Sequence, residues 1–472
     1  MKSKNSLRTA SLALTLTGLI SASCDSLLDV DLPTTTVLQE SVFTDEITAT
    51  SAVKGIYADM ISTNGFVSGG NASVAYISGL SADELTNVNA QPDFTNFENN
   101  TINPRNDIVL SIWSTTYKTI YEANAVIEGL SASGSTIPEI TKNQLLGEAL
   151  FLRAFAHFYL VNLFGNIPLI LTTDYNINAK TTRTTTVEVQ DRIVSDLLRS
   201  ASLIGEAYTG IERQRVNKGA VQALLARVYL YREQWENASA LASEVISKSL
   251  YILEPQLDKV FLATSREAIW QLAYPTSLAV TTYEGQTFII QSLNDVTNVL
   301  SDEFLNALEA NDARHASWIG TFSISPEKTV HFPYKYKLKY GSVQPTPLTE
   351  HSTILRLAEQ YLIRAEAYAH QDKLTESMRD LDTIRSRANL PLISNTSPAL
   401  SKEELLQSIQ HERQIELFTE GAHRWFDLKR TGEALIVLQA IKPGISKDDL
   451  LFPIPQTELN TNSVLGNQNP GY

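Results

Sequence analysis

The sequence predicts an all-α-dominated fold, built as one folded body with minor β content. Three observations support this prediction. Helical periodicity prevails from Val42 onward, and the stretch from Ala149 to Phe164 has only three polar residues among sixteen. Two segments also resemble each other at a constant offset of 139 residues. With 43% hydrophobic residues in 472, the chain has ample material for a large core.

The N-terminus is typical of an exported protein. A positive head containing Lys2, Lys4 and Arg8 precedes an apolar or small-residue run, and three small residues stand directly before Cys24. This layout predicts a signal peptide over residues 1–23. Cys24 is the only cysteine, so no intramolecular disulfide can form.

A single thiol at this position resembles the acylated cysteine of a bacterial lipoprotein, and we predict lipidation at Cys24. Ser21 departs from that pattern, because such sites usually carry Leu there. The alternative is an incidental cysteine beside an ordinary cleavage site.

A short polar segment follows Cys24. The stretch "DSLLDVDLPTTT" is acidic and ends in a proline and three threonines, so we predict an extended tether over residues 24–41. The folded body then covers residues 42–472. No later segment has the run of about 18 apolar residues that a membrane-spanning helix requires.

Two long helices are expected early in the body. Trp113, Tyr117, Ile120 and Asn124 are spaced for one face of the first. The second is predicted over residues 143–164, because a glycine and then a proline follow it in the positions where a helix ends.

The two similar segments are "LLARVYLYREQWENASALASEVI" from Leu224 and "IRAEAYAHQDKLTESMRDLDTIR" from Ile363. Each is typical of two helices joined by a tight turn, in the manner of tetratricopeptide units. Such pairs bury their apolar faces against neighbouring pairs, which explains how the helix over 143–164 can lack a polar face. The alternative is a chance similarity of two amphipathic hairpins.

The helical pattern fails over residues 64–106 and 274–340. Both stretches are rich in Asn, Thr, Ser, Gly and Pro, with scattered aromatic residues. They are long for structureless connections, and we interpret them as two variable insertions that form binding loops.

Four motifs occur in order along the chain: "FLRAFAHFYLVNLFGNIPLI", "LRLAEQYLIRAEAYA", "ERQIELFTEGAHRWFDLKRTG" and "LFPIPQTELNTNSVLGNQNPGY". They resemble the successive signatures of the SusD/RagB family of outer-membrane lipoproteins of Bacteroidetes. The resemblance implies a single domain of four tetratricopeptide-like helix pairs with a loop-rich ligand-binding face. It also implies a cell-surface protein, lipid-anchored in the outer membrane, that captures an oligosaccharide or other nutrient and caps a SusC-like TonB-dependent transporter.

Other function classes find little support. A formal charge of -14 and a pI near 5.1 argue against a nucleic-acid partner. There is no phosphate-binding loop and no cluster of Cys and His for a metal, so we expect no cofactor, metal site or catalytic residue. A surface glycan hydrolase and a tetratricopeptide-type scaffold without a small ligand remain as alternatives. The resemblance implies binding without turnover.

Several motifs are expected to be structural. Arg153 and His157 lie one helical turn apart, and we expect a core histidine with its hydrogen bonds satisfied, not a base. The spacing of the acidic and basic residues in "ERQIELFTEGAHRWFDLKR" places opposite charges on one helix face, which predicts a salt-bridge network and not an acid–base pair. The residues concerned are Glu416, Glu420, Arg424 and Asp427. Four tryptophans are expected in the core: Trp113, Trp235, Trp270 and Trp425.

Candidate ligand contacts come from the two insertions. Sugar rings present flat C–H faces between hydroxyl groups, so their sites combine aromatic faces with amide or carboxylate partners. The first insertion offers such a mixture in "QPDFTNFENN" and the second in "TTYEGQTFI". The predicted ligand-binding residues are Phe94, Asn96, Phe97, Tyr283, Phe288 and Trp318. The alternative is that these rings only pack the loops onto the helical body.

Overall fold

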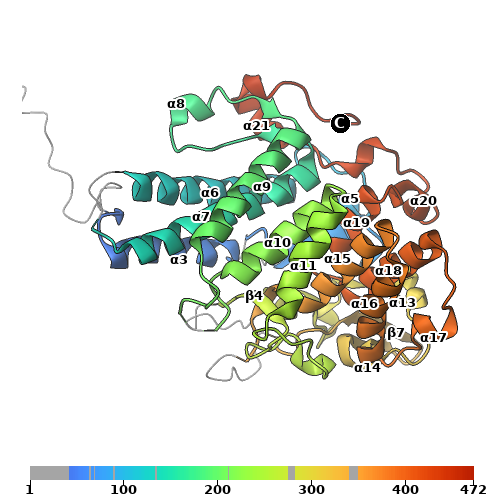
Figure 1. Ribbon diagram of the computed structural model, residues 1–472. Helices are drawn as coiled ribbons and strands as arrows, with labels where there is room; N and C mark the ends of the chain where they lie inside the picture. The colour runs from blue at the N-terminus through green and yellow to red at the C-terminus, as the bar shows by residue number, and fades with distance from the viewer. Residues whose placement is uncertain are drawn as a thin grey trace, which may run out of the picture. The chain divides into compact units, whose positions relative to one another are not determined.

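The computed structural model describes residues 42–62, 65–67, 70–88, 91–132, 136–210, 212–274, 282–339 and 349–472. The predicted signal peptide, Cys24 and the tether over residues 24–41 lie outside the described residues. Residues 43–472 form one unit by their internal contacts. Figure 1 shows this unit.

Helices make up most of the described chain, as predicted (Figure 1). The helices of eight or more residues are α3 (Glu46–Met60), α4 (Val74–Ser81), α6 (Asp107–Ser131), α7 (Glu139–Phe164), α9 (Thr186–Leu203), α10 (Lys218–Tyr231), α11 (Trp235–Ser247), α15 (Leu357–His370), α16 (Leu374–Arg387), α18 (Lys402–Glu416) and α19 (His423–Arg430). The shorter ones are α5 (Pro92–Glu98), α8 (Tyr175–Asn178), α12 (Tyr283–Phe288), α13 (Asp302–Ala307), α14 (Ala313–Trp318), α17 (Ile393–Thr396), α20 (Ala434–Gln439) and α21 (Gln456–Thr461).

The strands of the described residues pair two by two and antiparallel. The pairs are β1 (Leu85–Asn87) with β5 (Asn298–Leu300), β2 (Ile167–Pro168) with β3 (Arg183–Thr184), β4 (Ala268–Leu272) with β8 (Ser352–Arg356), and β6 (Ile319–Ser325) with β7 (Lys328–Pro333). None of these pairs forms a core sheet. They join segments to the helical body, in keeping with the predicted minor β content.

The apolar helix α7 lies at the centre of the N-terminal half. It begins at Glu139, four residues earlier than predicted, and ends before Gly165, whose φ of 74° favours glycine. Twenty of its 26 residues are buried. Helices α3, α6, α9 and α10 all contact it, so each of its sides faces protein. None of the helices in the described residues is both long enough and apolar enough to cross a membrane.

The polar residues inside α7 make long-range contacts. Arg153 binds Asp196 of α9 with two hydrogen bonds of 2.8 Å and Asn124 of α6 with one of 2.7 Å. These bonds fix three helices to one another. His157 is buried as predicted, and no side chain among the described residues binds its ring nitrogens. Burial lowers the pKa of His157 to about 3, and the nearby Arg153 adds to this, so the ring is neutral.

The two similar segments form equivalent helix pairs. Helices α10 and α11 are joined at Glu233, and α15 and α16 at Asp372, which occupies the equivalent position 139 residues later. These two turn residues have φ of 57° and 59°. In both turns a backbone N–H closes back onto a tyrosine carbonyl at 2.9 Å, from Gln234 to Tyr229 and from Lys373 to Tyr368. The predicted repeat is therefore confirmed in its helices and in its turn.

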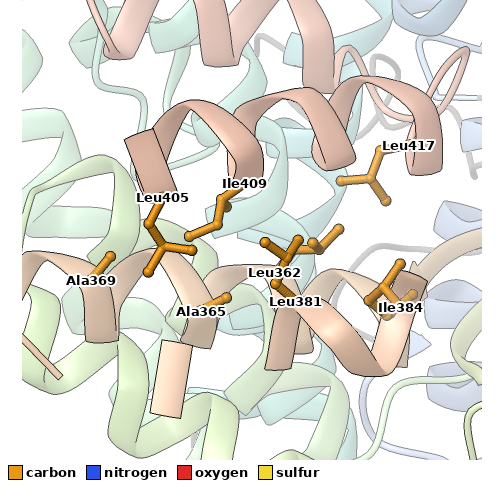
Figure 2. Packing of buried hydrophobic residues seen from close by; sticks show 9 residues of the cluster. Leu362, Ala365, Ala369, Leu381, Ile384, Leu405, Ile409 and Leu417 are labelled. Carbon is orange, nitrogen blue, oxygen red and sulfur yellow. The ribbon is translucent and has the colours of Figure 1, made fainter. Parts of the chain in front are cut away.

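Helix α15 is shared by two apolar clusters. Toward α10 and α11 it contributes Ile363 and Ala367 to a cluster that includes Ala226 and Leu230. Toward α16 and α18 it contributes residues to the second apolar cluster, which Figure 2 shows. That cluster contains Ala358, Leu362, Ala365, Ala369, Leu381, Ile384, Leu405, Ile409 and Leu417. Small residues on both faces let α15 pack closely between its neighbours.

Three of the four tryptophans predicted for the core are buried, namely Trp113, Trp270 and Trp425. Trp235, at the first position of α11, packs against an apolar cluster but stays partly exposed. Its assignment to the core is therefore only partly correct.

The motif from Glu412 to Arg430 departs from the predicted single helix. Helix α18 ends at Glu416, and a turn with positive φ at Thr419, Gly421 and Ala422 separates it from α19. Glu416, Glu420, Arg424 and Asp427 therefore do not lie on one helix face. The predicted salt-bridge network does exist, but its bonds reach residues far away in the sequence.

Glu416 is the centre of this network. Its carboxylate is fully buried and binds Arg356 at 2.6 Å, Arg314 at 3.0 Å and also Arg387. The three arginines come from β8, α14 and α16. Although burial alone would raise the pKa of Glu416, the three guanidinium groups hold it well below the usual value.

Glu420 extends this network, whereas Arg424 and Asp427 form ion pairs of their own. Glu420 binds Arg356 and Lys335. Arg424 binds Asp83, which lies 341 positions earlier in the sequence. Asp427 binds Arg413 at 2.8 Å and Arg430 at 2.7 Å. These ion pairs are structural, as the sequence analysis expected.

Replacing Glu416 by Gln should lower the free energy of unfolding by about 3–5 kcal/mol, because the three arginines would lose their common anion in a buried place. Chemical denaturation at pH 7 measures this. Glu376→Gln, at an exposed position of α16, is the matched control and should change the value little.

Wild type and Glu416→Gln also test the pH dependence of the free energy of unfolding. The lowered pKa of Glu416 means that its stabilisation is complete above the unfolded-state value of about 4.3 and is lost as the pH falls below it. The difference between wild type and Glu416→Gln should therefore shrink below about pH 4. A difference that stays constant down to pH 3 would contradict the assigned role.

Candidate ligand-binding face

The two insertions meet in the structure. Strand β1, from the first insertion, pairs with β5 from the second, with Leu85 opposite Leu300. Beside this pair, the ring of Tyr76 contacts Phe94 at a centroid distance of 5.4 Å and Phe288 at 6.1 Å. The described parts of the two insertions therefore form one face, which we call the loop face. It consists of the described residues within 64–106 and 274–340.

Helix α4 fixes the first insertion to the helical body. All eight of its residues are buried, and Ser73 caps its N-terminus. At its C-terminus the ammonium of Lys442 donates to the carbonyl oxygens of Leu80, Ser81 and Ala82 at 2.7–3.0 Å. Burial lowers the pKa of Lys442 to about 8, so it remains mainly charged at neutral pH.

The residues after α4 connect both insertions to the ion-pair network. Asp83 binds Arg424, and Glu84 accepts a hydrogen bond from the backbone of Thr419. The backbone carbonyl of Glu84 in turn accepts from Ser301, the residue that follows β5. Burial, and after it the charge of Asp83, raise the pKa of Glu84 to about 8, which keeps this carboxyl mostly protonated at neutral pH.

A small cavity lies where the insertions meet the body. Its volume is about 30 Å³, and its lining includes Val67 from the first insertion, Phe288 and Lys335 from the second, and Glu420. Burial lowers the pKa of Lys335 to about 8. The cavity has room for a water molecule but not for a sugar ring.

Four of the six predicted ligand residues are buried. Phe94 is 6% exposed and Phe288 4%, while Phe97 and Trp318 are fully buried. Phe94 and Phe288 contact Tyr76, and Phe97 contacts Phe452 at 5.4 Å. Rings enclosed in this way have no open face to stack on a sugar, so the structure favours the packing alternative for all four.

Trp318 has a distinct environment. Its ring centroid lies 4.9 Å from the ammonium of Lys335 and 5.8 Å from the guanidinium carbons of Arg356 and Arg387. Its indole N–H donates to the carbonyl of Leu257 at 3.1 Å. The ring is thus part of the buried charge network, where cation–π contacts help to balance the positive charge.

The remaining two predicted residues, Asn96 and Tyr283, are partly exposed on the loop face. Tyr283 begins α12 and its ring meets Tyr274 edge-on at 5.0 Å. Asn96 lies within α5. Both therefore stay candidates for ligand contact.

Sequence reasoning missed the residues that organise this face. Tyr76 lies in an apolar run that gives no hint of its position between two insertions. The pairing of Asp83 with Arg424 has no local sign either, because the two residues are so far apart in the sequence. Within the described ranges, no three His, Cys, Asp or Glu residues are arranged to hold a metal ion.

Two protein-family models match parts of this chain. A family model described as "Starch-binding associating with outer membrane" matches residues 49–230, and one described as "SusD family" matches residues 279–472. Among curated relatives, SusD-like protein P2 of Formosa agariphila is 28% identical over 488 residues, covering 92% of this chain and 94% of the relative. SusD-like protein P38 of the same organism is 25% identical over 430 residues, with 77% and 80% covered.

Solved structures have the same fold. A SusD superfamily protein from Bacteroides vulgatus gives a TM-score of 0.79 at 21% identity, covering 91% of this chain and 100% of that chain. A structure described as a laminarin-binding SusD-like protein gives a TM-score of 0.76 at 24% identity, again covering 91% and 100%. At these identities the likeness establishes the fold, which is tetratricopeptide-like.

The burial of Phe94 leads to a testable prediction. Phe94→Ala should lower the free energy of unfolding by about 3–5 kcal/mol, because it leaves a cavity beside Tyr76. Tyr283→Ala, on the exposed part of the same face, should cost about 1 kcal/mol or less. Denaturant titration of both variants measures this. If both variants lost equally little free energy of unfolding, Phe94 would again be a candidate for ligand contact.

Proposed function

Because this chain belongs to the SusD family of binding proteins associated with the outer membrane, we propose that it captures glycans on its loop face at the cell surface and caps a TonB-dependent transporter. The family assignment rests on two models that together match most of the chain. The glycan, the transporter and the surface location are our inference.

Members of this family are non-catalytic binding proteins. This decides against the alternative of a surface glycan hydrolase. It also agrees with the roles of the acidic residues in the network, since Glu416, Glu420 and Asp427 are each bound by two or more cationic side chains. Carboxylates held in this way are not available to transfer protons.

The observation that carries the glycan proposal is the meeting of the two insertions on one face. Asn96 from the first and Tyr283 from the second supply an amide and a partly exposed ring, the two ingredients of a sugar site. The description of the first family model as starch-binding and the laminarin-binding relative of the same fold support this chemistry. A scaffold without a small ligand would not require such a face.

The proposed attachment involves the N-terminal region. We propose that Cys24 carries lipid and that residues 24–41 form a tether between the membrane and the folded body. The family's association with the outer membrane supports this arrangement. Stable attachment needs more than one acyl chain, because a single chain gives only marginal membrane binding.

Glycan binding can be tested with the folded body, residues 42–472. An array of neutral and acidic glycans should identify at least one ligand. For that ligand, Tyr283→Ala should weaken binding by roughly 30-fold, or about 2 kcal/mol, as for a central anchor residue. Tyr175→Ala, at an exposed tyrosine of α8, is the matched control and should bind normally. An array without any ligand would argue for the scaffold alternative.

Attachment and capping can be tested in cells. The wild type should incorporate a fatty-acid analogue, and gentle detergent extraction should recover it with a large outer-membrane β-barrel. Cys24→Ala should lose the label, because it lacks the acceptor thiol. Equal labelling of the variant would refute the anchor, and recovery of the wild type only as a monomer in several detergents would refute the transporter contact.

A further inference from the structure

A second and larger cavity lies among the helix pairs. Its volume is about 630 Å³, within the range of about 300–1,000 Å³ that is usual for ligand sites. It is enclosed by the turn between α10 and α11, by α15, and by α18, α19 and α20. None of its lining residues belongs to either insertion. We call it the helix-pair cavity.

One wall of this cavity is aromatic. The rings of Trp235 and His370 stack at a centroid distance of 3.8 Å with an interplanar angle of 7°. Trp235 is partly exposed, whereas the other four of the five tryptophans are buried. Tyr231, whose ring packs against Phe158 and Phe426, also belongs to the lining.

The facing wall carries a row of amides. Gln407, Gln410 and Gln414 recur on α18 at intervals of three and four residues, so they lie along one side of that helix. Gln410 donates to Glu366 at 3.1 Å and Gln414 donates to Asp83 at 3.4 Å. The side chain of Gln407 is exposed. Amides both donate and accept, which suits the hydroxyl groups of a sugar.

The charge of the cavity disfavours anions. Its two arginines are already paired, Arg430 with Glu366 and Arg424 with Asp83. Burial lowers the pKa of both His370 and His411, so these rings stay neutral at neutral pH. The remaining charged residues of the lining are three exposed glutamates, which lie where water screens them: Glu233, Glu403 and Glu433.

We propose that the helix-pair cavity is a second binding site, for a neutral saccharide of one or two rings that stacks on the wall formed by Trp235. The amides of α18 would bind its hydroxyl groups. This proposal does not require that a glycan bind on the loop face.

Tryptophan fluorescence provides the test. Because the other tryptophans are buried, acrylamide should quench mainly Trp235 in the folded protein. Neutral disaccharides of glucose, galactose, mannose and xylose are the probes. At least one should protect Trp235 from quenching in a saturable way. Protection should be the same at about 0.05 M and about 0.5 M salt. Ion pairing weakens strongly over this range, but a neutral ligand forms no ion pair.

Two variants locate the binding. Gln407→Ala should weaken it about fivefold, the effect of losing one hydrogen bond. Val437→Phe places a larger side chain in the cavity and should abolish protection. Both positions are outside the core, so the fold should persist, which melting curves check. Gln190→Ala, the same kind of substitution on α9 and outside the cavity, should behave as wild type.

Three outcomes would overturn the proposal. One is the absence of protection by any of the disaccharides. Another is protection that persists unchanged in Val437→Phe. The third is protection only by amines that disappears with salt, which would assign the cavity to cations held by the rim glutamates. Loss of glycan binding in Tyr283→Ala together with intact protection of Trp235 would show that the two sites are independent.

Discussion

One buried carboxylate, that of Glu416, holds together elements from the whole C-terminal half. Arg314 of α14, Arg356 of β8 and Arg387 of α16 all bind it, and the side chains of these three arginines are almost entirely shielded from water. Removing charges from water is costly, so such a cluster is stable only when each member has its partners in place. The network therefore tolerates one arrangement of these elements and penalises others. Lys335, which binds Glu420, extends this constraint to the second insertion, and the separate pair of Arg424 with Asp83 fixes the first.

The helical part could be predicted from the sequence because its signals are local. The apolar run in α7 and the spacing of small and aromatic residues in the two helix pairs arise from packing within a few turns. Even the turn positions of Glu233 and Asp372 follow from the offset between the repeats. The first residue of α7 could not be predicted as well, because Pro138 caps it without a side-chain hydrogen bond.

The candidate site was harder to predict for a physical reason. Aromatic residues interleaved with Asn and Asp, as around Phe94, occur both in exposed sugar sites and in loops packed on a core. Only the three-dimensional structure distinguishes these two cases, and here the ring of Tyr76 packs against Phe94. The same holds for the charges after Glu416. Their spacing suggested bonds along one helix, but a turn at Thr419 directs them to partners distant in the sequence.

The pairing of Asp83 with Arg424, 341 positions apart, has a consequence for the order of folding. Contacts between distant segments close long loops, and their entropy cost must be met before they stabilise anything. Helix pairs such as α10 and α11 can form as soon as their own residues are available. The loop face needs nearly the whole chain, since β1 pairs with β5 and α4 is held by Lys442. The loop face is therefore expected to be among the last parts of the protein to form.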